Sequence, residues 1–101
     1  MSRWKHHIKN GKKLRKAIND DDNVQTLEAL KECYKEINRI MVSVFDDDDL
    51  EDILSEIDNQ LDNCKNYEDY SMTEDDIQEE INWQLSRLYD FCDEWGIWVE
   101  V

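Results

Sequence analysis

The stretch DNVQTLEALKECYKEINRIMVSVF, residues 22–45, has the most regular apolar pattern in the chain. Its apolar positions recur every three or four residues, as one face of an α-helix requires, and comprise Leu27, Leu30, Tyr34, Ile37, Met41 and Val44. Asp22, with Gln25 three residues later, matches a capping box at the start of such a helix. We therefore expect a helix over residues 22–45 that buries one face.

Two further helices are predicted, each with an acidic start and an apolar stripe. The helix over residues 47–66 carries Leu50, Ile53, Leu54, Ile57, Leu61 and Cys64 on its stripe. The helix over residues 73–95 carries Ile77, Ile81, Leu85, Leu88, Cys92 and Trp95. Capping-box spacings at Ser71–Glu74 and Thr73–Asp76 mark the start of this last helix, and Gly96 suits the left-handed position that ends one.

The two ends of the chain are less regular. Residues 2–18 can be laid on a helix with an apolar face and a lysine-rich face, with Gly11 as the place where it would break. Asn10-Gly11 is alternatively a type I′ hairpin turn, although the flanking alternation is poor. Residues 97–101 alternate like a short strand, or fold back to cover the helices.

These segments predict one all-α domain over residues 1–101, without proline and with only two glycines. Short connections favour antiparallel neighbours, so we expect a small antiparallel bundle of three to four helices. Its parts are a basic N-terminal helix or arm at 1–18, bundle helices at 22–45, 47–66 and 73–95, and a short extended C-terminal tail at 97–101.

The charge of the chain is divided sharply along the sequence. The first sixteen residues contain seven Lys or Arg and no acidic residue, whereas residues 17–101 contain 5 basic and 26 acidic side chains. A body this acidic is repelled by nucleic acid and by anionic membranes, so its electrostatically steered partners should be basic. No apolar run is long enough to span a membrane, no signal peptide is evident, and three cysteines do not suit a disulfide framework. We expect a cytoplasmic protein.

The acidic helices supply the candidate partner-binding residues. Carboxylates three or four positions apart on a helix lie roughly 5–6 Å apart, a spacing comparable with that of phosphates along a nucleic-acid strand. Trp83 lies opposite the apolar stripe of its helix and is a candidate apolar anchor, unless another segment covers it. The candidates are Asp48, Glu51, Asp52, Glu56, Asp58, Asp62, Asp76, Glu80, Trp83, Asp90 and Glu94. The plainer interpretation is a solvated face that happens to be acidic.

Enzymatic and metal chemistry have less support. Glu28, Glu32 and Glu36 have the helical spacing used by magnesium-dependent nucleotide pyrophosphohydrolases, but they face away from the apolar seam. Adjacent histidines cannot easily share one metal ion, and no Cys-x-x-Cys motif is present. The cysteines fall on or beside apolar faces, as small buried side chains do. We expect no catalytic residues, no metal and no cofactor.

The chain is thus expected to be a small binding protein that inhibits or masks a basic, nucleic-acid-handling partner. In size, acidity and helicity it is similar to phage-encoded nucleic-acid mimics and to nuclease immunity proteins, which is an argument by analogy. The alternative is a self-associating structural or adaptor module, in which the basic arm of one copy docks on the acidic face of another. A third option is that the arm, with its tryptophan and histidines among lysines, binds RNA.

Overall fold

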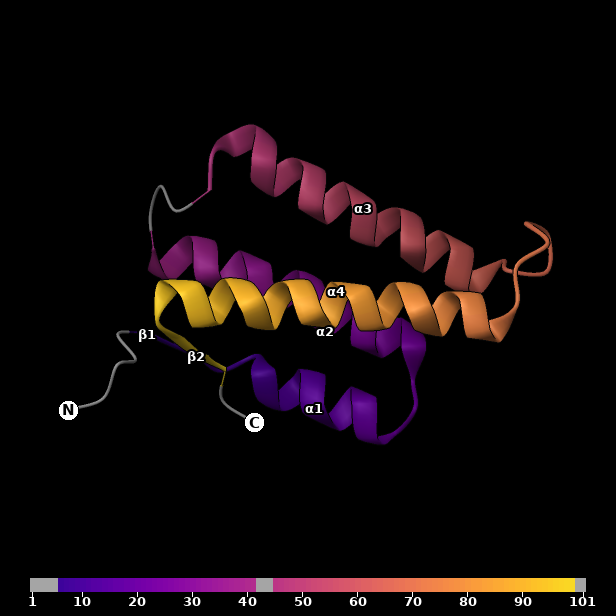
Figure 1. Cartoon of the computed structure of the whole chain (residues 1–101), viewed down its shortest axis with the longest axis horizontal. Helices are drawn as coiled ribbons and strands as arrows, with labels where there is room; N and C mark the ends of the chain where they lie inside the picture. Colours follow the sequence, from indigo (N-terminus) through magenta and orange to yellow (C-terminus); the bar gives the residue numbers. More distant parts are fainter. Residues whose placement is uncertain (1–5, 42–44, 100–101) are drawn as a thin grey trace.

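A computed structural model describes residues 6–41 and 45–99 of the chain, and most of these residues are helical (Figure 1). Within these residues the elements are β1 (His6–Ile8), α1 (Gly11–Asn19), α2 (Asn23–Ile40), α3 (Asp47–Lys65), α4 (Glu74–Trp95) and β2 (Ile97–Val99). The helical fold class is therefore confirmed, with the addition of a two-stranded sheet.

Helix α2 is the central element, because it packs against α1, α3 and α4. Its buried residues are spread over more than one face and comprise Thr26, Leu27, Ala29, Leu30, Cys33, Tyr34 and Ile37. The predicted cap is confirmed, since the Asp22 side chain accepts the backbone N–H of Gln25 at 3.0 Å. The helix ends at Ile40, so its predicted extension is wrong for Met41 and Phe45; residues 42–44, among them Val44, lie outside the described residues.

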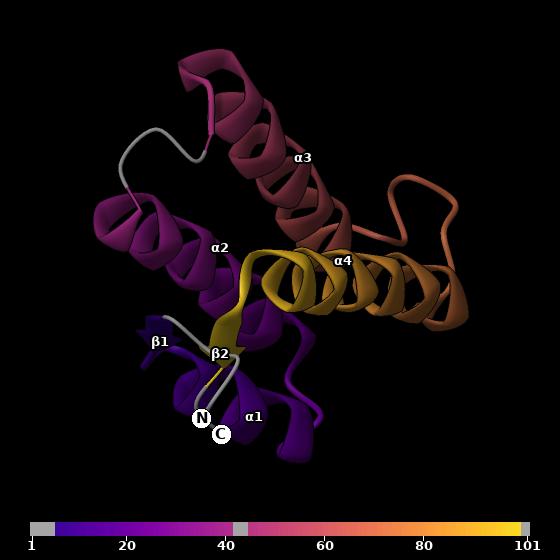
Figure 2. The ribbon, with the colours of Figure 1, turned by 60° about the vertical axis from the view of Figure 1, so that its left-hand side comes forward.

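Helices α3 and α4 match the predicted segments within one residue at each end. The stripe of α4 is buried at Ile77, Ile81 and Leu88. Of the two predicted capping boxes, the structure uses Thr73 and Asp76, whose side chains each accept the backbone N–H of the other residue. Figures 1 and 2 show that α3 approaches α4 at the end of α3 and diverges from it toward its start.

A parallel pairing of the two chain ends was not foreseen. β1 pairs with β2 in the register His6 with Ile97, His7 with Trp98 and Ile8 with Val99. The helix predicted from residue 2 is thus wrong for residues 6–10, and so is the hairpin turn; residues 2–5 lie outside the description. The physical reason is that β1 pairs with β2, which lies at the other end of the chain, and Ile8 is fully buried in this arrangement. The strand alternative for the C-terminal segment is confirmed over Ile97–Val99.

Gly96 makes this pairing possible. It ends α4 with φ 69° and ψ 40°, the left-handed conformation that glycine adopts without a Cβ clash. The chain then turns directly into β2, which brings it beside β1 (Figure 2). The sequence-based assignment of Gly96 as a helix terminator is therefore confirmed.

Two polar residues of the described chain are buried, Thr26 and Gln84. The Thr26 hydroxyl donates to the backbone oxygen of Asp22, whereas neither Oε1 nor Nε2 of the fully buried Gln84 has a hydrogen-bond partner among the described residues. Burying an amide without partners opposes folding, because the group loses its bonds to water and gains none in return.

Replacing Gln84 by Leu is expected to raise the free energy of unfolding by about 1–2 kcal/mol, because the new side chain has a similar size and needs no partner. Urea unfolding followed by circular dichroism measures the change. The matched control is Gln78→Leu, at an exposed site of the same helix, which should change stability by less than about 0.5 kcal/mol. A clearly destabilised Gln84→Leu variant contradicts the expectation.

Candidate functional site

The charge separation seen along the sequence becomes a separation between helices. α1 contains four basic residues and no acidic one, and α2 contains three of each. α3 and α4 each contain eight acidic residues and one basic residue, so each has a net charge of −7. The molecule therefore has one basic helix, one neutral helix and two strongly acidic helices.

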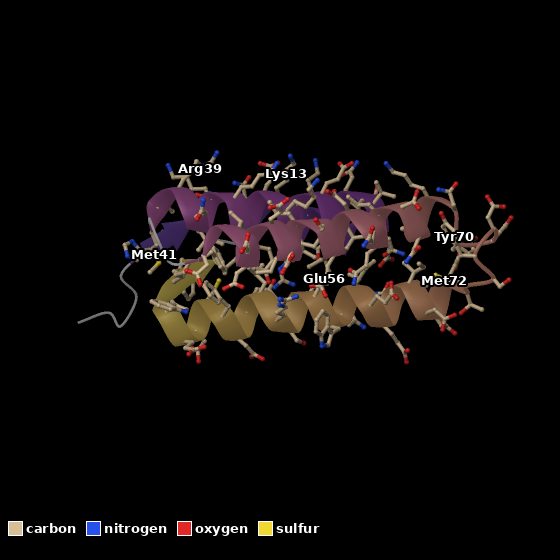
Figure 3. All side chains as sticks on the ribbon, turned by 90° about the horizontal axis from the view of Figure 1, so that it is seen from above. Lys13, Arg39, Met41, Glu56, Tyr70 and Met72 are labelled. Atoms are coloured by element: carbon tan, nitrogen blue, oxygen red, sulfur yellow. The ribbon has the colours of Figure 1, made fainter. Side chains whose placement is uncertain are left out.

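The neutral helix separates the opposite charges in space. α1 lies on one side of α2 and α3 lies on the other (Figure 1). Figure 3 shows side-chain nitrogens gathered along one edge, where Lys13 and Arg39 are labelled, and many side-chain oxygens along the opposite edge on α4. Lys13 and Lys16 form no ion pair within the described residues.

A groove between α3 and α4 brings several predicted residues together. It has a volume of about 640 Å³ and opens broadly to solvent. Its walls are formed by Glu56, Trp83, Ser86, Arg87, Asp90, Phe91 and Glu94, which we call the Trp83 groove. Four of the predicted binding residues, three carboxylates and the tryptophan, are in this set. An aromatic ring among carboxylates at an open groove suits a cationic or polar protein surface.

Arg87 organises this groove. Its Nη1 atom lies 2.6 Å from Oε2 of Glu56, and this ion pair joins α4 to α3. Its guanidinium also lies over the Trp83 ring, with Cζ 5.3 Å from the ring centroid, a cation–π arrangement. Trp83 stays 55% exposed, so the alternative in which another segment covers it is wrong for the described residues.

The other predicted carboxylates lie elsewhere. Asp58 pairs with Lys31 of α2, Asp62 accepts the hydroxyl proton of Tyr70, and Asp76 belongs to the capping box of α4. One oxygen of Glu80 is buried and has no hydrogen-bond partner in the described part of the chain. The remaining three, which are exposed on α3 and form no ion pair within the described residues, are Asp48, Glu51 and Asp52.

The groove also contains residues that were not selected from the sequence. Phe91 stacks on Phe45 with ring centroids 4.9 Å apart, and Trp95 follows at 6.0 Å from Phe91. Arg87 was overlooked as a site residue, although it is the only basic residue after Lys65. A single arginine in an otherwise acidic helix is the sequence signal that could have identified Arg87.

The cysteines do not form a reactive site. Cys33 and Cys92 are buried, and burial raises the pKa of each thiol to about 12. The pKa of the half-buried Cys64 is also raised, again mainly by desolvation. Thiols protonated at neutral pH are poor nucleophiles and poor metal ligands. Among the described side chains, no three His, Cys, Asp or Glu residues lie together in a way that holds a metal ion.

Glu36, considered above as a possible catalytic carboxylate, has a structural role. It reaches from α2 and accepts the backbone N–H groups of Lys9 and Asn10, and the side-chain amide of Asn10, at 2.9–3.0 Å. Partial burial alone raises its pKa, but these hydrogen bonds outweigh burial and lower the pKa overall. Glu36 thus fixes the turn between β1 and α1, where Asn10 provides no side-chain cap.

Comparison with known proteins gives no relative, since no family model, curated protein or solved structure matches the chain. None of the helices in the described part of the chain is both long and apolar enough to cross a membrane.

Replacing Glu36 by Gln is expected to lower the free energy of unfolding at neutral pH by about 1 kcal/mol, because a charged acceptor becomes a neutral one. Its folded-state pKa is lowered, so the carboxylate stabilises the fold above the ordinary value of 4.5 and loses that contribution as the pH falls through the folded-state pKa. The difference between wild type and variant should therefore shrink on acidification, as followed by denaturant unfolding at several pH values.

The control is Glu28→Gln, at an exposed glutamate of the same helix that makes no hydrogen bond within the described residues. It should change stability by less than about 0.5 kcal/mol at neutral pH. A Glu36→Gln difference that widens as the pH falls is incompatible with the role assigned to Glu36.

Proposed function

We propose that the chain is a small acidic binding protein that inhibits or masks a basic, nucleic-acid-handling partner by occupying the surface that nucleic acid would contact. The partner meets the α3–α4 face, with carboxylates in the place of phosphates and Trp83 as the apolar anchor. The acidic body itself does not bind DNA, because like charges repel. On this proposal the protein acts in the cytoplasm and belongs to a phage or another mobile element.

The observation that carries the proposal is the Trp83 groove. A tryptophan that is more than half exposed lies among carboxylates that have no ion pair within the described residues, Asp90 and Glu94. Tryptophan and arginine are the residue types that most often anchor protein interfaces, and both occur here side by side. Basic side chains of a partner would pair with these carboxylates, and its apolar atoms would pack against the indole ring.

Self-association is the second candidate, and one observation favours it. The basic α1 and the acidic α3 lie on opposite sides of α2, so two copies of the chain could meet through faces of opposite charge. Exposed charges of this kind attract strongly only at low ionic strength. Analytical sedimentation separates the two candidate functions. A monomer at low salt supports the inhibitor function, whereas an apparent mass that rises with protein concentration supports the self-associating module.

The test of the inhibitor role uses two variants with the same loss of charge. Asp90→Asn with Glu94→Gln removes carboxylates from the Trp83 groove, and Asp75→Asn with Glu79→Gln removes an equally spaced exposed pair outside it. The immobilised wild-type protein should retain a basic protein from lysate at low salt and release it at about 0.5 M salt, because salt screens exposed charges.

The retained protein should also be released by added DNA or RNA, and its affinity should fall by about tenfold or more for the groove variant and by clearly less for the control. Retention that is indifferent to salt and to nucleic acid removes the electrostatic proposal. If the two variants lose affinity equally, the acidic surface binds the partner but the Trp83 groove has no specific role.

A further inference from the structure

A second pocket lies beside the Trp83 groove, on the other side of Arg87. It has a volume of about 340 Å³ and is formed by residues from three helices and the segment before α3. Its lining residues are Tyr34, Phe45, Asp49, Asp52, Ile53, Arg87 and Phe91, which we call the Tyr34 pocket. It shares Arg87 and Phe91 with the Trp83 groove, so a bound surface can engage both.

One of the residues that line the pocket carries an unsatisfied polar group. Tyr34 is only 1% exposed, and its buried hydroxyl has no hydrogen-bond partner among the described residues. Burial raises the pKa of this hydroxyl to about 12, although the nearby charge of Arg87 acts in the opposite direction. The hydroxyl is therefore protonated and neutral at ordinary pH, and it keeps free lone pairs for a donor.

The charges at the pocket favour a cation. Asp49 and Asp52 are exposed on the first turns of α3 and form no ion pair within the described residues. The one cationic side chain in the lining, Arg87, is already paired with Glu56. A phosphate group would meet two carboxylates with no unpaired base to balance them, so an anionic ligand is disfavoured.

The molecule itself shows how this surface holds a guanidinium. Glu56, one helical turn after Asp52 on α3, binds the guanidinium of Arg87 while Trp83 provides an aromatic face. The Tyr34 pocket repeats these elements, with Asp52 as the carboxylate and the stacked rings of Phe45 and Phe91 as the aromatic wall. It differs by adding a second carboxylate and the Tyr34 hydroxyl.

We infer that the Tyr34 pocket binds the guanidinium of an arginine side chain supplied by the basic partner, an assignment that rests on the proposed function. The flat guanidinium lies against the aromatic wall and donates hydrogen bonds to Asp49, Asp52 and the oxygen of Tyr34. Lysine is a poorer occupant, because its compact ammonium group neither stacks nor presents a planar fork of donors.

The test compares two peptides of equal charge, eight arginines or eight lysines, titrated into the full-length protein at low salt and followed by fluorescence anisotropy. Wild type is expected to bind the arginine peptide about fivefold or more tightly than the lysine peptide. Tyr34→Phe, which removes only the unpartnered hydroxyl and should still fold, reduces this ratio toward one. Asp52→Asn should also reduce the ratio of the two affinities toward one. The control is Glu51→Gln, at a neighbouring residue outside the pocket, which should weaken the binding of both peptides equally and leave the ratio unchanged.

The outcomes separate this assignment from the proposed function. If both peptides bind with equal affinity and lose affinity in salt, the proposal of an acidic binding face is supported and the assignment of the Tyr34 pocket to arginine is refuted. If neither peptide binds, the proposed function fails and the pocket assignment fails with it. In NMR spectra the arginine peptide should shift the ring signals of Tyr34, Phe45 and Phe91; shifts caused by inorganic phosphate instead would overturn the assignment.

Discussion

The constraint on which the structure depends is that two helices of like charge must share one core. α3 and α4 each have a net charge of −7, and both pack on the neutral α2 more extensively than on each other. Both helices bury apolar residues against α2, and α4 also packs on β2, while their carboxylates must remain in water because a buried, unpaired charge opposes folding strongly. The divergence of α3 from α4 toward the start of α3 is the arrangement that this repulsion favours.

That divergence creates the features that suit binding. Where α3 and α4 separate, aromatic side chains and Arg87 fill part of the space and leave two open depressions, the Trp83 groove and the Tyr34 pocket. Arg87 lines both depressions, and within the described residues its ion pair is with Glu56. Exposed ion pairs are each worth only about 0–1 kcal/mol, so we attribute to Arg87 a positioning effect on the indole and on Glu56 more than a large share of stability.

Local patterns in the sequence were sufficient for α3, α4 and α2 up to Ile40, because helical periodicity and capping residues act over a few neighbours. They placed Trp83 opposite the apolar stripe of its helix but left its exposure open. They were insufficient for β1, whose strand conformation depends on a partner at the other end of the chain. The same limit explains the site. Trp83 could be selected from its phase on one helix, whereas the roles of Arg87, Tyr34 and Glu36 depend on contacts between elements, which no local pattern contains.

The central claim is that most of the acidic side chains of α3 and α4 are exposed and repel one another, although Glu56 and Asp58 form ion pairs. The most direct measurement is the free energy of unfolding as a function of sodium chloride, from low salt to about 0.5 M. Screening of this repulsion should raise the free energy of unfolding by about 1 kcal/mol or more over that range. A free energy that falls with added salt would mean that attractive ion pairs dominate the surface, and would contradict the account.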